Sequence, residues 1–178
     1  MVSPAFGANS KNPTSLSARQ KAAHLLSRTT FGATPNDIDE LTRKGQTGIQ
    51  SWIETQLNPS TIKDVEVERK LKKIPSIWMT NQEIYLNYSR YARPKKSKNE
   101  NDEQAPKGTF KDVLSELSTQ KFIRAVESKR QLQEVLVDFW FNHFNVDFEK
   151  GQDKWLVTSY EREVIRPNVF GKFSKLLK

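Results

Sequence analysis

The feature that most constrains the fold of this chain is the spacing of apolar side chains between residues 131 and 143. They recur at i, i+3, i+4, i+7 and i+8, with an imidazole at i+11, so they share one face of an α-helix. The series is Leu132, Val135, Leu136, Phe139, Trp140 and His143. Because the sequence nowhere shows strand-like alternation bounded by turn residues, we predict an all-α fold.

Local signals divide residues 16–60 into a predicted unit of three short helices. Thr34 has the character of an N-cap, and a proline follows it at the first helical position. Gly45 marks the end of the second helix. Two pairs have the spacing of a capping box, namely Ser17 with Gln20 and Thr47 with Gln50. The tight joints predict a compact N-terminal unit.

The regions on either side of this unit are less regular. Residues 1–15 are small and polar, which predicts a disordered tail. Residues 61–108 form a variable helical and charged insertion, in which 62–73 predict at best an exposed helix. An aromatic stripe over 77–91 is typical of a core helix. The Pro-containing, charged stretch 93–108 predicts a flexible loop.

Residues 109–178 form an aromatic-rich helical part of the same domain. A third capping box, Ser128 to Gln131, opens the periodic helix described above. Asp153 caps a further helix, which Pro167 is expected to stop. Because the sequence ends inside this helical part, we predict an irregular multi-helix array that is incomplete at its C-terminus.

Composition limits the chemistry available to the chain. It has 178 residues and no Cys, which excludes disulfides, thiol nucleophiles and Cys-based metal sites. Neither a signal peptide nor an apolar run long enough for a membrane span is present. The net charge of +8 makes nucleic acid worth considering, and residues 61–98 carry much of the basic excess. A solvated, flexible loop is the alternative explanation, because acidic residues follow this segment directly.

The densest cluster of polar and aromatic residues lies between residues 138 and 145. Asp138, Asn142 and His143 are the candidate catalytic residues, and Glu134, Asp138 and His143 are the candidate metal ligands. Glu134, Asp138 and Asn142 share one helical face, which could hold a cation or supply a general base. The alternative is a structural polar network, with Glu134 paired to Arg130 and Asp138 paired to Gln131 or Gln133. No catalytic motif identifies a cofactor, which remains unknown.

Two blocks of the sequence resemble a bacterial family catalogued as domain of unknown function 1800. The first block is 22–35, which reads Ala-Ala-His-Leu-Leu-Ser-Arg-Thr-Thr-Phe-Gly-Ala-Thr-Pro. The second comprises Ser128 to Gln131, then 138–146, 165–167 and 170–173. The resemblance implies a mostly helical, exported or periplasmic protein that is longer than this chain. It therefore implies that the sequence is the N-terminal part of such a protein.

Three functions stay open from the sequence. The first is a binding or assembly module of an exported or envelope-associated bacterial protein, with the missing C-terminal half or another protein as partner. The second is part of an enzyme or metal site centred on Asp138, Asn142 and His143, completed by that C-terminal half. The third is weak nucleic-acid binding through the basic segment 61–98. The lack of catalytic motifs argues against an enzyme formed by this chain alone.

Overall fold

The computed structural model describes residues 16–89, 91, 108–144, 146 and 151–177. These residues are helical and contain no strand, which confirms the predicted all-α class. The predicted tail 1–15 and nearly all of the predicted loop 93–108 lie outside the described residues. The helical elements are α1 (Ala18–Thr29), α2 (Pro35–Leu57), η1 (Pro59–Thr61), α3 (Val65–Leu71), η2 (Ser76–Trp78), α4 (Asn81–Tyr88), α5 (Phe110–Glu127), α6 (Gln131–Phe144), η4 (Asp153–Trp155), α7 (Val157–Ser159), η5 (Tyr160–Ile165), α8 (Arg166–Asn168) and α9 (Phe173–Leu176).

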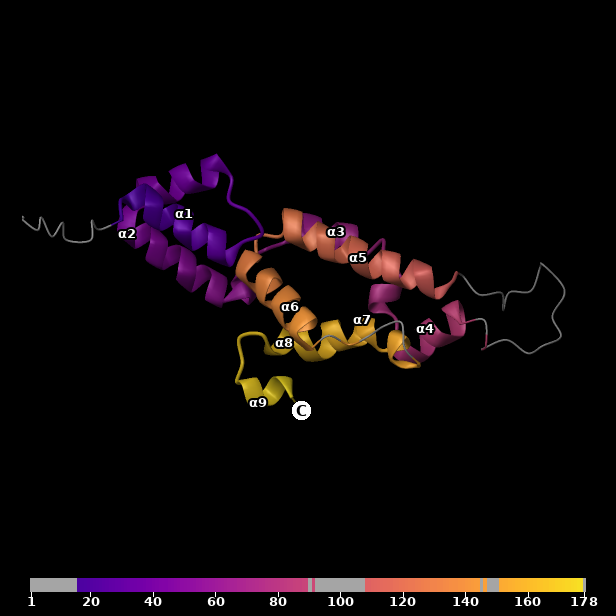
Figure 1. Ribbon diagram of the computed structural model, residues 1–178. Helices are drawn as coiled ribbons and strands as arrows, with labels where there is room; N and C mark the ends of the chain where they lie inside the picture. The colour runs from indigo at the N-terminus through magenta and orange to yellow at the C-terminus, as the bar shows by residue number, and fades with distance from the viewer. Residues whose placement is uncertain (1–15, 90, 92–107, 145, 147–150, 178) are drawn as a thin grey trace, which may run out of the picture.

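Helices α1 and α2 lie side by side at one end of the molecule (Figure 1). The capping box at Ser17 forms, and Thr34 caps α2 through a similar box with Asp37. The sequence predicted three helices here, and α2 consists of two helical stretches joined by a kink at Gly45, where the backbone is not helical. That residue has a φ of 62°, in the left-handed region that glycine tolerates best. Buried Ala22, Leu26 and Leu41 hold the pair together.

Helix α3 corrects the expectation of an exposed helix in 62–73. Val67 and Leu71 are almost fully buried and pack with Ile74, Ile77 and the α5 residue Ile123. Charged residues surround Val67 and Leu71 in the sequence, so their i, i+4 spacing was not recognised as an apolar face. That spacing is enough to bury one side of a short helix. This segment is therefore part of the core.

The aromatic stripe over 77–91 contains a break. The segment divides into η2 and α4, because Thr80 forms a capping box with Glu83 that starts a new helix. Ile84 and Tyr88 pack against Trp155, as expected for a core helix, whereas Trp78 is exposed. The aromatic side chains thus serve as core only on the face of α4 that meets α5 and η4.

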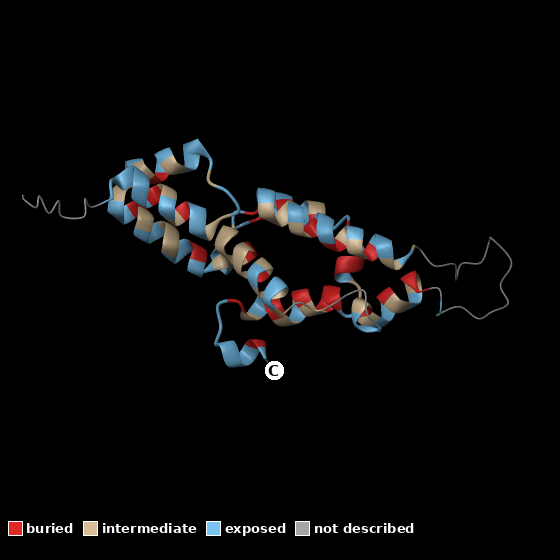
Figure 2. Cartoon of the chain, viewed as in Figure 1, coloured by how far each residue is buried: buried red, intermediate tan, exposed pale blue. Residues whose placement is uncertain are grey.

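The long helices α5 and α6 meet at a short corner. The third capping box does not form as predicted: the Ser128 hydroxyl accepts from the Arg130 backbone N–H at 3.0 Å and donates to Asp64, and Gln131 accepts from the Phe31 backbone N–H. The corner is therefore fixed both by local hydrogen bonds, including one from Gln131 Nε2 to the carbonyl of Ser128 at 2.7 Å, and by contacts with distant parts of the chain. Figure 2 shows buried positions interspersed with exposed ones on each helix, which fits several small cores.

The C-terminal run is nearly continuous from η4 to α8. The run ends at Asn168, directly after Pro167, which is where the sequence predicted the stop. Between α7 and α8 the backbone forms a six-residue π-helix, η5. Of the helices that the structure describes, none combines the length and the apolar character needed to cross a membrane.

Candidate functional site

The buried face of α6 carries a carboxylate in its centre. Glu134 and Val137 are the two buried residues of this helix, whereas Phe139 of the predicted apolar stripe is exposed. A second carboxylate, Glu161 of η5, faces the same interior. The side chains of Glu134 and Glu161 are only 4% and 3% exposed, so their charges require partners.

Two arginines supply those partners. Arg166 donates to both carboxylate oxygens of Glu134, at 2.7 and 2.9 Å, and to Oε1 of Glu161 at 3.0 Å. Arg124 lies 3.4 Å from Oε1 of Glu134. We call these four residues the ionic cluster. Their directional, charge-assisted bonds join α5, α6 and the C-terminal run at one point.

The arginines of the ionic cluster influence one another. Burial lowers the pKa of Arg124, and the positive charge of Arg166 lowers it further. Burial also acts against the charged form of Arg166, but its ion pairs with Glu134 and Glu161 outweigh that effect and raise its pKa. Both guanidinium groups are charged at neutral pH.

The π-helix explains why Glu161 and Arg166 meet. Five residues apart in an α-helix, two side chains would point about 140° away from each other. In η5 the backbone N–H of Arg166 donates to the carbonyl of Glu161, which widens the turn and brings both side chains to one side. Because π-helical turns are rare and often occur at functional sites, this turn marks the cluster as a candidate site.

Two further residues of α5 complete the network. Gln120 donates to Oε1 of Glu161 at 2.8 Å and accepts from Arg124 at 2.9 Å. The ammonium group of Lys121 lies 3.2 Å from Asp138 and 3.7 Å from Oε2 of Glu161. Within the described part of the chain, Oε2 of Glu161 has no hydrogen-bond donor.

The structure places the sequence-predicted residues in two neighbouring sites. Asp138, Asn142 and His143 line an open cavity of about 590 Å³. Residues of α1 form its opposite wall. Asn142 donates to the carbonyl of Asp138 at 2.8 Å, and exposed His143 stacks on Phe139. Glu134 instead belongs to the ionic cluster. Among the described residues no three His, Asp or Glu side chains form a group that could hold a metal ion.

The predicted surface pairs of the alternative network do not form. Arg130 donates to the carbonyl of Ile62 rather than binding Glu134, and Asp138 pairs with Lys121. A polar network is present, but its partners come from other helices. Sequence reasoning missed Arg124 and Glu161. The only signal for Arg166 was its place in the second block of the resemblance.

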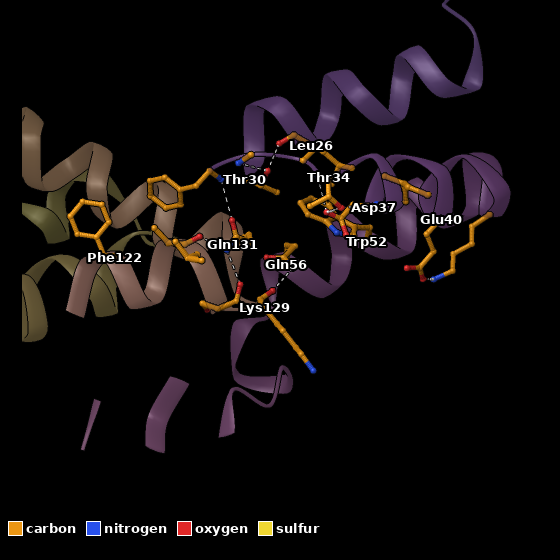
Figure 3. A pocket seen from close by; sticks show the side chains of 18 residues that line it. Leu26, Thr30, Thr34, Asp37, Glu40, Trp52, Gln56, Phe122, Lys129 and Gln131 are labelled. Atoms are coloured by element: carbon orange, nitrogen blue, oxygen red, sulfur yellow. Dashed lines mark hydrogen bonds and ion pairs between the residues drawn. The ribbon is translucent and has the colours of Figure 1, made fainter. Parts of the chain in front are cut away.

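A second cavity, of about 650 Å³, lies where α1 and α2 meet the corner between α5 and α6. Gln56 donates to the carbonyl of Lys129 at 2.8 Å and accepts from the Leu132 backbone N–H at 3.1 Å. Figure 3 shows Gln56, Lys129 and Gln131 on its floor, between Phe122 on one side and Trp52 on the other. Side-chain amides thus fasten the N-terminal pair to the rest of the chain.

The fold and the site define an all-helical protein in which a buried ionic cluster connects several small apolar cores. The model of the family described as Protein of unknown function (DUF1800) matches residues 24–178, which include every site residue above. The chain therefore belongs to this family, and the resemblance given by the sequence is confirmed. No curated protein and no solved structure matched the chain.

Proposed function

We propose that this chain is a protein-binding module whose partner docks on an exposed apolar face made by Phe31, Phe122 and Val126. These residues are 48%, 72% and 77% exposed, and all three border the 650 Å³ cavity. Apolar side chains gathered beside a hollow are typical of interaction surfaces, and aromatic ones are enriched at interface cores. This exposed group, called the Phe122 face below, is the observation that carries the proposal.

The Phe122 face is held in place before any partner binds. The backbone N–H of Phe31 donates to Oε1 of Gln131 at 3.1 Å, which fixes α1 beside the α5–α6 corner. Phe122 and Val126 are one helical turn apart on α5 and point in similar directions. A surface that is already ordered loses little conformational entropy on binding, which favours a docking role.

Photo-crosslinking in the protein's own host cells tests this proposal. A benzophenone amino acid replaces Val126 in the full-length protein, and the matched control places it at exposed Leu86 on α4. We expect an adduct from position 126 that disappears when Phe122→Asp is added. Equal adducts from positions 126 and 86, or adducts that persist with Phe122→Asp, would show that this face is not the docking surface.

The same experiment bears on the partner and its location. We propose a bacterial exported or envelope-associated setting, which is supported by the family resemblance alone. An adduct without a gain in mass identifies a C-terminal part of the same polypeptide as the partner, and an adduct with added mass identifies another protein. Protease treatment of cells with a permeabilised outer membrane should then degrade the protein, whereas protection until the cells are fully lysed would place it in the cytoplasm.

A second candidate function is an enzyme or metal site at Asp138, Asn142 and His143. The observation that favours it is that all three line the one open cavity of about 590 Å³. With this function, His143→Ala in the full-length protein abolishes Zn²⁺ uptake, measured by calorimetry, and leaves its circular dichroism unchanged. Unchanged uptake would exclude His143 as a ligand, and loss of folding would identify it as a packing residue.

A further inference from the structure

The two sequence blocks that carry the family resemblance meet at one cavity. It is the open cavity of about 590 Å³ between the end of α1 and one face of α6. Every residue that lines it, except Val135, belongs to the blocks 22–35 and 138–146. None of these lining residues is buried, so packing of a core does not account for their residue types.

Four polar side chains of this cavity have hydrogen-bonding atoms without a partner among the described residues. The side chains of Arg28 and His143 take part in no hydrogen bond or ion pair there. Asn142 donates its amide nitrogen to the carbonyl of Asp138, which leaves its side-chain oxygen unpaired. Asp138 binds Lys121 through Oδ1 alone, and its side chain is 43% exposed. The cavity therefore offers both donors and acceptors.

These groups favour a ligand that donates and accepts hydrogen bonds at once. The guanidinium of Arg28 can only donate, whereas the unpaired oxygens of Asp138 and Asn142 can only accept. A ligand that displaces solvent and supplies only one kind of group leaves the other kind unpaired, which costs free energy. A hydroxyl group donates one hydrogen bond and accepts others, so a ligand rich in hydroxyls satisfies both kinds. The formally charged lining residues, Arg28 and Asp138, have opposite signs and do not select an ion.

Exposed aromatic rings lie on both walls of the cavity. Phe31 at the end of α1 is 48% exposed, and Phe139 of α6 is 54% exposed. His143 stacks on Phe139 with 5.7 Å between the ring centroids, which orients both rings. The face of an aromatic ring is electron-rich, so it attracts weakly positive C–H groups. A sugar ring has C–H groups on its faces and hydroxyls around its edge, which matches this combination of walls.

We propose that this cavity binds a neutral saccharide. A C–H face of a sugar ring packs on Phe139, and its hydroxyls accept from Arg28 and donate to Asp138 and Asn142. The volume of about 590 Å³ lies within the range of roughly 300–1,000 Å³ that is usual for ligand sites. A cavity of about 150 Å³ holds a benzene ring, and a sugar ring is somewhat larger, so there is room for about two linked sugar units.

The proposal goes beyond the docking role and names a ligand class for the second candidate function. It rests on the cavity of that function, but on neither catalysis nor a metal ion. Phe122 does not line this cavity, so Phe122→Asp should retain saccharide binding. Phe31 borders both sites and is left unchanged in the tests. The two proposals can therefore fail separately.

NMR titration of the ¹⁵N-labelled full chain tests the site. The probes are four neutral disaccharides: cellobiose, maltose, mannobiose and N,N′-diacetylchitobiose. We expect at least one to shift the backbone amides of Arg28, Phe139 and His143. Tetraglyme, which only accepts hydrogen bonds, and benzoate, which is an anion, should bind more weakly than that disaccharide. No shifts with any of the four, shifts elsewhere, or equal binding of tetraglyme or benzoate would overturn the proposal.

Two variants identify the contacts, and a third is the matched control. Arg28→Met removes the donor and should weaken disaccharide binding about tenfold, as expected for one hydrogen bond to a charged group. Phe139→Ala removes the ring and should weaken it about two- to tenfold. Arg43→Met changes an exposed arginine of α2 that does not line the cavity, and should have no effect. If Phe139→Ala unfolds the chain, Arg28→Met decides alone. Equal affinities of Arg28→Met and Arg43→Met would contradict the site.

A comparison of chain lengths separates two sources of the saccharide. Tighter binding of the four-unit homologue than of the disaccharide supports a polysaccharide, whose further units contact the protein beyond the cavity. Equal or weaker binding supports a free small saccharide. Absence of binding by all four disaccharides refutes the site, while the crosslinking result at position 126 and the Zn²⁺ uptake measured for His143→Ala remain independent of it.

Discussion

Substitution of Arg166 by Met gives a direct measure of the ionic cluster. The side chain makes three hydrogen bonds to two buried carboxylates, at 2.7, 2.9 and 3.0 Å. Its loss leaves Glu134 with only Arg124, at 3.4 Å, and removes one partner of Glu161. Removal of one member of a buried ion pair costs about 3–5 kcal/mol, so we expect the free energy of unfolding to fall by about this amount. Urea titration followed by circular dichroism measures it.

Arg69→Met is the matched control for this measurement. Arg69 also makes two hydrogen bonds to a glutamate, at 3.0 and 2.8 Å to Glu66, but its side chain is 56% exposed, against 16% for Arg166. Solvent screens such a pair, and the expected loss is about 0–1 kcal/mol. If both variants lose the same stability, the buried pairs contribute no more than surface ones and our account of the cluster is wrong.

The double variant Glu134→Leu with Arg166→Met separates lost attraction from stranded charge. A buried carboxylate without its arginine is costly, whereas a pair replaced by apolar side chains can be nearly neutral. We therefore expect the double variant to be more stable than Arg166→Met alone. A double variant whose loss equals the sum of the two single losses would show that these residues do not interact.

Three further predictions concern the fold, each measured by urea unfolding. Gly45→Ala should cost about 1 kcal/mol, because φ at this kink is 62°, and an unchanged stability would argue against the kink. Leu71→Ala should cost about 2–5 kcal/mol, since the side chain is buried, whereas Val65→Ala should be nearly neutral; similar effects would place α3 outside the core. Hydrogen bonds from the Thr109 backbone and hydroxyl lower the pKa of Asp112. Its contribution is therefore present above the ordinary carboxyl pKa and is lost as the pH falls through the lowered value, so Asp112→Asn should be less stable than the wild type at pH 7 and similar to it once the pH is below that lowered value.

The parts of the fold that sequence reasoning predicted are those fixed by neighbours in the chain. The caps at Ser17 and Thr34 join residues three apart, so their spacing is visible in the sequence. The predicted box at Ser128 did not form because Gln131 Oε1 accepts from the Phe31 backbone N–H, 100 residues away, while the Ser128 hydroxyl also donates to Asp64, 64 residues away. The pattern of a serine followed by a glutamine three residues later does not show which groups the two side chains will hydrogen-bond.

The ionic cluster could not be predicted for a related reason. The apolar period of α6 was read as the buried face, but Glu134 and Val137 point inward and Phe139 is exposed. Aromatic residues occupy several faces of this helix, so periodicity alone does not select the inner one. The carboxylate of Glu134 can be buried only because an arginine 32 positions later forms an ion pair with it. That meeting depends on how α6 and η5 pack, which a single sequence does not show.

The π-helix connects this packing to the chemistry of the site. In a regular α-helix each residue turns the side-chain direction by about 100°, so without the π-helix Arg166 would point away from Glu161. Arg166 could then no longer bind carboxylates from two different helices at once. The wide turn therefore sets the register of α6 on the C-terminal run. The binding of one arginine to two buried carboxylates therefore depends on the π-helical turn as much as on the residue types themselves.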